Sequence, residues 1–136
     1  FHPKANVEKM AHGIPLTDAD RWDWLVSLRE ESLRRLALGH DGVVLSCSAL
    51  KLKYRDVIRI APFHSHQNVR VQFFYLDAPE DVLRVRVQAR KGHYMGANMV
   101  HSQFIILEPP GKNEPDVFRI NVSRPINLVQ EEVLVK

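Results

Sequence analysis

The fold is decided by Val43-Val44-Leu45-Ser46-Cys47-Ser48-Ala49-Leu50-Lys51, a stretch in which an apolar run leads straight into a helix start. Residues 43–47 form a short apolar run that begins with two β-branched valines, which is typical of a parallel strand covered on both faces. Ser48 can cap the helix that follows, which we expect to run from Ala49 to about Ile60. The stretch therefore predicts a strand that passes directly into a helix.

The same alternation continues along the chain. A long helix is expected before this stretch, at about 17–38, and the later segments are rich in β-branched and aromatic residues or bounded by proline and glycine. We expect strands at 71–76 and 117–122, and helices at 79–92, 97–108 and 125–135. Strands that alternate with helices predict an α/β fold built on a parallel sheet, with helices on its faces, in a single domain of residues 1–136.

The long helix carries a clear start signal. Thr17 is followed three residues later by Asp20, which is the capping-box pattern, and Gly39 is suited to end the helix. Its apolar residues fall on one stripe, and charged residues such as Arg29 are expected to face water. The inward stripe is predicted to comprise Trp22, Leu25, Val26, Leu33 and Leu36.

Composition narrows the class of protein. The chain has 136 residues, of which 45% are hydrophobic and 26% are charged, as in an ordinary globular domain. No apolar run approaches the roughly 18 residues of a membrane helix, so no membrane partner is expected. The single cysteine, Cys47, excludes an internal disulfide; we expect a buried structural thiol and a cytoplasmic protein. The net charge of +3 favours anionic partners.

Two pairs of basic residues stand one helical turn apart. Lys51 and Arg55 follow the first strand, where ligands bind in open parallel sheets, and could form an anion site. They could equally form a solvated basic helix face. Arg86 and Arg90 precede Gly92 and would suit a mobile lid at about 86–100, since arginine forks match phosphoryl oxygens. They could instead complement the dipole at a helix C-terminus.

Several ordered strings give the chain a family resemblance. It resembles the gluconokinases of the P-loop kinase superfamily along almost its whole length, and the order and spacing of the strings together are specific. The matching strings are His2-Pro3 with Asn6, Glu8-Lys9-Met10, Gly13-Ile14-Pro15-Leu16, Asp18 with Asp20-Arg21 and Trp24-Leu25, Cys47-Ser48-Ala49-Leu50-Lys51 with Tyr54-Arg55-Asp56, Ala89-Arg90-Lys91-Gly92-His93, and Ser102-Gln103-Phe104 with Leu107-Glu108.

The resemblance implies an activity. Gluconokinases transfer the γ-phosphate of ATP, with Mg²⁺, to the 6-hydroxyl of D-gluconate and so supply 6-phosphogluconate to the pentose phosphate pathway. It also implies a homodimer, since relatives are commonly dimers. Nucleic acid is not expected as a partner, because the basic residues lack interleaved aromatic residues for base stacking.

The resemblance further implies roles for individual residues on the substrate side. The histidine would hydrogen-bond gluconate hydroxyls, and the two arginines would hold the polyol and its carboxylate. The lysine and the glutamine would assist them, and the serine could add its hydroxyl or the amide at its helix start. The six positions are His2, Arg21, Ser48, Lys51, Arg55 and Gln103.

On the nucleotide side, the resemblance implies that Arg86 and Arg90 belong to a lid over ATP, where they would clamp adenine or phosphates with His93 nearby. No metal ligands are predicted within the chain. His64 and His66 could ligate a metal ion, but no cysteine or carboxylate neighbours them to complete a ligand set.

The superfamily's phosphate-binding string, G-x-x-x-x-G-K-[ST], does not occur in these 136 residues. In relatives it lies upstream of the His-Pro pair, as does the aspartate that would act as general base, so both are expected before Phe1. The sheet would then lack the P-loop strand and most of the second strand. We expect a truncated form or fragment of a kinase that does not phosphorylate gluconate alone. The alternative is a non-catalytic gluconate-binding pseudokinase.

Overall fold

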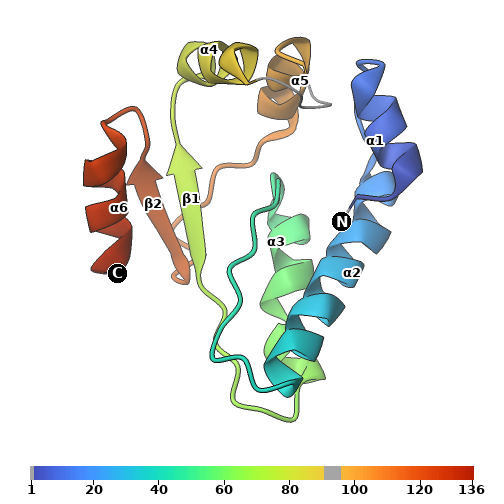
Figure 1. Cartoon of the computed structure of the whole chain (residues 1–136), viewed down its shortest axis with the longest axis vertical. Helices are drawn as coiled ribbons and strands as arrows, with labels where there is room; N and C mark the ends of the chain where they lie inside the picture. The colour runs from blue at the N-terminus through green and yellow to red at the C-terminus, as the bar shows by residue number, and fades with distance from the viewer. Residues whose placement is uncertain (1, 91–95) are drawn as a thin grey trace.

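The computed structural model describes residues 2–90 and 96–136 (Figure 1). Six α-helices, one 3-10 turn and two strands are found in these ranges. No helix among them combines the length and apolar character that crossing a membrane requires. In chain order the elements are α1 (Lys4–Ala11), α2 (Asp18–Ala37), α3 (Leu52–Arg59), η1 (Ala61–His64), β1 (Phe73–Asp77), α4 (Glu80–Ala89), α5 (Asn98–Ile106), β2 (Val117–Asn121) and α6 (Ile126–Leu134).

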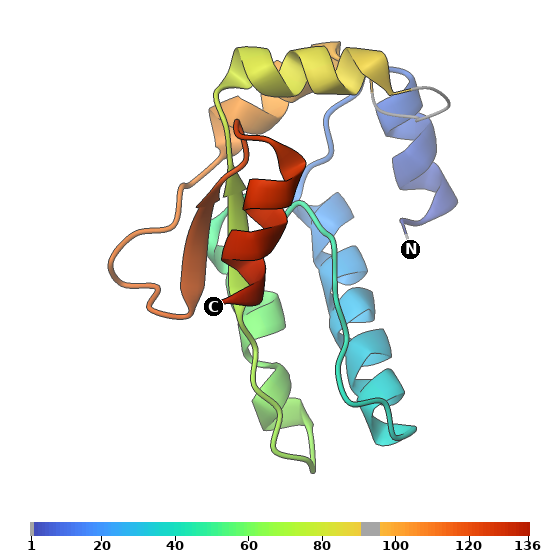
Figure 2. The ribbon, with the colours of Figure 1, turned by 60° about the vertical axis from the view of Figure 1, so that its left-hand side comes forward.

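The two strands pair in parallel, which confirms the predicted sheet type. The register sets Phe73 opposite Val117 and Asp77 opposite Asn121. Helix α6 covers one face of the pair, where Ile120 is fully buried against Val129 (Figure 2). Phe73 packs on the other face against a core formed by α2 and α3. Helices on both faces of a parallel pair give the predicted α/β architecture.

The predicted strand at 43–47 is wrong for the described structure. This segment is extended but belongs to no sheet, because β1 pairs with β2 alone among the described residues. A strand is defined by hydrogen bonds to a neighbour, and an apolar sequence cannot supply that neighbour. Val44 is consequently fully exposed, while Leu45 and Cys47 pack against the core of α2 and α3.

Burial raises the pKa of the half-buried Cys47 thiol to about 11, so it stays protonated at neutral pH.

The helix after this segment begins later than predicted. Ser48 is not its cap: α3 starts at Leu52, and Lys51 occupies the N-cap position without a capping side chain. Ala49 and Leu50 remain extended because their carbonyl groups accept hydrogen bonds from the Arg55 side chain instead of from a helix backbone. A side chain of α3 itself therefore binds these carbonyl groups, and the capping signal of the serine does not decide where the helix begins.

Helix α2 begins and ends as predicted. The Thr17 hydroxyl accepts from the Asp20 amide while the Asp20 carboxylate accepts from the Thr17 amide, and Gly39 follows with φ 93°. The predicted inward stripe was partly wrong. Trp22 is 45% exposed and Trp24 is buried in its place. Arg29, expected to face water, is buried and donates to the Val57 carbonyl at 3.2 Å.

The later helices follow their sequence signals closely. Helix α4 begins after Pro79, and α5 and α6 lie within the predicted ranges. The predicted end of α4 at Gly92 lies outside the described residues. Met99 of α5 is buried against Met10 of α1 and Leu16, so this third apolar cluster joins the first helix of the chain to α5.

A substitution that leaves a cavity in the core of α2 and α3 should destabilise the protein strongly. Leu25 is fully buried, so Leu25→Ala should lower the free energy of unfolding by about 2–5 kcal/mol. Leu38, at the end of the same helix, is 66% exposed, and Leu38→Ala should cost roughly 0.5 kcal/mol or less. Urea unfolding followed by circular dichroism measures both. Equal losses in the two variants would contradict the packing described.

Candidate functional site

The start of α2 and the start of α3 bring two predicted substrate residues around one aromatic ring. Tyr54 is fully buried, and its ring lies 5.7 Å from the Arg21 guanidinium carbon and 5.6 Å from the Lys51 ammonium nitrogen. Arg21 is itself buried and donates to the Leu16 carbonyl. With the Lys53 ammonium nitrogen 5.9 Å away, three cations surround this ring, which is the charge that an anionic ligand would need.

Asp18 offsets part of the positive charge of this site in the described state. Its carboxylate accepts hydrogen bonds from the ammonium groups of Lys53 and Lys51, the latter at 2.9 Å, and from the Tyr54 hydroxyl. The bonds from Lys53, Tyr54 and Lys51 hold the pKa of Asp18 well below its ordinary value. The same carboxylate raises the pKa of Lys51 and keeps that lysine charged.

His2 adds a polar ring at the edge of this site. It stacks on Trp24 with ring centroids 3.9 Å apart and planes 18° apart. Burial, and in addition the positive charge of Arg21, lowers the pKa of His2 below 6.5. A largely neutral imidazole at pH 7 can exchange hydrogen bonds with hydroxyl groups, which suits the role that the resemblance implies.

Arg55 lies in a different environment from the one expected. Its guanidinium forms a two-bond fork with the Glu114 carboxylate, both bonds 2.7 Å long, and both side chains are about 5% exposed. Arg59 adds a bond to the same carboxylate at 2.8 Å, and Asp116 holds Arg59 at 2.6 Å. The predicted role of Arg55 in gluconate binding stays a prediction; it would require Glu114 to release the guanidinium.

The remaining predicted residues are not joined to this site. None of the hydrogen bonds or ion pairs within 2–90 and 96–136 links Ser48, which is exposed, or Gln103, which is half-buried on α5, to Arg21 or Lys51. Arg86 on α4 donates to the Val122 carbonyl at 2.6 Å, and Arg90 is exposed just after α4. His93 lies outside the described residues. Their proposed roles remain predictions.

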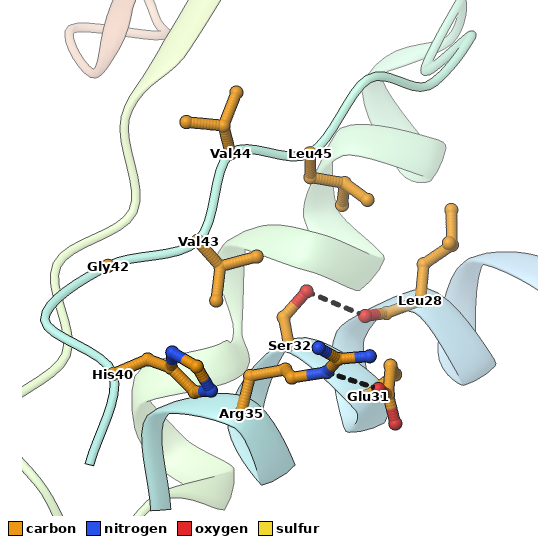
Figure 3. A pocket seen from close by; sticks show the side chains of 9 residues that line it. All are labelled: Leu28, Glu31, Ser32, Arg35, His40, Gly42, Val43, Val44 and Leu45. Atoms are coloured by element: carbon orange, nitrogen blue, oxygen red, sulfur yellow. Dashed lines mark hydrogen bonds and ion pairs between the residues drawn. The ribbon is translucent and has the colours of Figure 1, made fainter. Parts of the chain in front are cut away.

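A hollow of about 340 Å³ lies elsewhere, between the second half of α2 and residues 42–45 (Figure 3). Val43 and Leu45 point toward α2, whereas Val44 points away. Its polar groups are satisfied locally: Arg35 pairs with Glu31 at 2.7 Å, and Ser32 donates to the Leu28 carbonyl. The hollow begins two helical turns from Arg21, so it is separate from the positive site.

Sequence reasoning missed three acidic residues that organise the site. Asp18 and Glu108 were noted within the family strings, but their partners lie 33 to 56 residues away in the chain. No sequence motif marks Glu114 as a partner of Arg55, because the two residues are 59 positions apart and only the fold brings them together. No three histidine, cysteine or acidic side chains in the described part of the chain are grouped so as to hold a metal ion.

Comparison with known proteins defines the class. No protein-family model matches the chain. A crystal structure of an unliganded sugar kinase from a Janibacter species superposes with a TM-score of 0.84 and 37% identity, over 98% of this chain and 73% of that one. The fold is therefore that of a sugar kinase, as predicted.

Two further relatives narrow the class to one family. A probable gluconokinase from Schizosaccharomyces pombe is 44% identical over 98% of this chain and 69% of its own length. The crystal structure of a gluconokinase from Sinorhizobium meliloti is 38% identical, with a TM-score of 0.77, over 98% of this chain and 70% of that one. The chain belongs to the gluconokinase family, which confirms the resemblance seen in its motifs.

The buried pair of Arg55 and Glu114 should make stability depend on acid. The hydrogen bonds from Arg55 lower the pKa of Glu114 from 4.5 to about 2. A carboxyl group whose pKa is lowered by folding stabilises the protein fully above its unfolded pKa, and this contribution is lost as the pH falls toward the folded value. The loss therefore falls between pH 4.5 and about 2.

We expect Glu114→Gln to reduce the pH dependence of the free energy of unfolding between pH 4.5 and about 2. Urea unfolding at a series of pH values measures this dependence. Glu114→Ala should cost about 3–5 kcal/mol at pH 7, because it leaves a buried guanidinium unpaired. Glu131→Gln, on the exposed surface of α6, is the control and should keep the parent profile. Parallel pH profiles for the parent and Glu114→Gln would contradict this assignment.

Proposed function

We propose that this chain carries the gluconate-binding side of a gluconokinase, an enzyme that transfers phosphate from ATP to the 6-hydroxyl of D-gluconate. The observation that carries the proposal is the pair of cations at the Tyr54 ring, Arg21 and Lys51, within a chain that is 44% identical to a probable gluconokinase. The product would be 6-phosphogluconate, the form in which a sugar acid enters carbohydrate catabolism.

In this proposal the carboxylate of gluconate binds Lys51 and Arg21. A planar guanidinium and an ammonium group both bond strongly to a carboxylate when water is largely excluded, as it is around the buried Arg21. Lys51 would exchange its bond to Asp18 for one to the ligand. The neutral His2 ring would then orient the polyol through its hydroxyl groups.

The nucleotide side is supported only by the placement of basic residues. Arg86 and Arg90, with His93, are proposed to face ATP. The phosphate-binding string is absent from these 136 residues, and the described residues offer no ligand set for Mg²⁺. No residue of this chain is therefore assigned to Mg²⁺ or to the phosphate groups of the P-loop string. A homodimer in the cytoplasm is proposed from the family alone.

The cations at the Tyr54 ring bear on gluconate alone and are compatible with a second candidate, a gluconate-binding protein without kinase activity. Calorimetry on the 136-residue chain separates the two. Both candidates predict gluconate binding. ATP binding that weakens in an Arg86→Ala, Arg90→Ala double variant supports the kinase, whereas no heat with ATP supports the second candidate. The chain alone is expected to show no turnover in an ATP-coupled gluconate assay, and turnover would contradict this.

The carboxylate site can be tested by one substitution. Lys51→Ala should weaken gluconate binding roughly tenfold, because a charge-assisted hydrogen bond to the ligand is lost. Lys112→Ala, an exposed lysine before β2, is the matched control and should leave the affinity unchanged. Glucose, which lacks the carboxylate, should compete poorly with gluconate in the parent chain. Equal affinity for gluconate in the two lysine variants would refute the assignment.

A further inference from the structure

We propose that Glu108 is a positioning residue for gluconate binding: it fixes the turn formed by residues 48–52, the substrate turn, and ties this turn to helix α5. The inference rests on the proposed function, since it assigns a purpose to the placement of Lys51. It is carried by the hydrogen bonds that converge on the backbone of the turn from two distant parts of the chain.

The substrate turn cannot hold itself in place. It ends at the start of α3, where the N-cap residue is Lys51, in an extended conformation with φ −104° and ψ 153° and with no capping bond from its side chain. The first amide groups of a helix have no partner within the helix, and lysine is a poor cap. The Leu52 amide therefore takes its partner from outside the turn, either from another part of the chain or from water.

Glu108 provides that partner and also bonds to the turn at a second point. Its carboxylate accepts from the Leu52 amide at 2.7 Å, and its own amide donates to the Leu50 carbonyl at 2.8 Å. The two bonds bracket Lys51 on both sides along the backbone. A carboxylate at a helix N-terminus also interacts favourably with the helix dipole, so the contact suits the negative charge of Glu108.

A second carboxylate acts on the same turn through Arg55. The Arg55 guanidinium donates to the carbonyls of Ala49 and Leu50 at 3.1 and 3.3 Å, and the fork with Glu114 fixes the direction of that guanidinium. The backbone on the N-terminal side of Lys51 is thus held from the loop before β2, and its C-terminal side from the residue that follows α5. The backbone on both sides of Lys51 is therefore held by hydrogen bonds, whereas its side chain bonds to Asp18.

The position of Glu108 links the substrate turn to helix α4. Helix α5 ends at Ile106, and Glu108 follows two residues later. Helix α5 packs against α4, which carries Arg86 and leads into Arg90. A displacement of α5 would therefore move Glu108 and, through two hydrogen bonds, the backbone on either side of Lys51. Substrate and nucleotide residues are connected by this path.

The test compares Glu108→Ala, Glu108→Gln and the control Glu131→Ala in the full chain. Calorimetry gives the affinity for gluconate, NMR gives the exchange rate of the Leu52 amide, and thermal unfolding gives stability. Glu108→Ala should weaken gluconate binding roughly tenfold and speed Leu52 exchange by a similar factor, because the amide loses a charge-assisted acceptor. Glu108→Gln keeps an acceptor oxygen and should recover most of both effects. Glu131→Ala should match the parent.

The outcomes are distinguishable. Faster Leu52 exchange in Glu108→Ala with unchanged gluconate affinity would overturn the positioning role and leave the proposed function standing. A parent chain that does not bind gluconate would overturn the proposed function and this inference with it. If Glu108→Ala unfolds, Glu108→Gln decides: an affinity and an exchange rate near those of the parent support the proposal, and a loss of affinity as large as tenfold overturns it.

Discussion

The fork between Arg55 and Glu114 is the interaction on which the described structure depends. A buried guanidinium without a partner is strongly destabilising, so Arg55 needs a carboxylate partner in the folded chain, and Glu114 is that partner in the described structure. Arg55 lies on α3, within the core of α2 and α3, whereas Glu114 lies in the loop that leads into β2. Arg59 and Asp116 extend the same contact to the edge of the sheet. The pair therefore fixes α3, and with it the substrate turn, relative to β1 and β2.

Local signals predicted the elements well because their causes are local. The capping box of Thr17 and Asp20, the glycine at position 39 and the proline before α4 each act within a few residues, and each marks the boundary that the structure shows. The parallel pairing of β1 and β2 also followed from the alternation of strands and helices. These features need no knowledge of distant residues.

The errors have a common cause in distant partners. Residues 43–47 have the composition of a buried strand, yet among the described residues no strand pairs with them. Trp22 and Trp24 are equally apolar, and only the packing of His2 and α3 decides that Trp24 is the buried one. In the site, Lys51 and Arg55 were predicted as one basic pair because they are four residues apart. The fold separates them by giving each its own carboxylate, Asp18 and Glu114, from remote segments.

This pairing bears on which ligand the site can select. In the described state Lys51 already bonds to a carboxylate, so a ligand that takes over this bond competes with Asp18 and not only with water. A sugar acid can make that exchange, because its own carboxylate restores the charge-assisted bonds that the lysine gives up. A neutral sugar offers only hydroxyl groups and would leave the ammonium group with a weaker partner, so Asp18 would keep it. On the proposed function, Asp18 thus biases the site toward acids before any contact with the rest of the polyol is made. Glu108 and Glu114 keep the backbone of the turn in place, which confines the exchange to the lysine side chain.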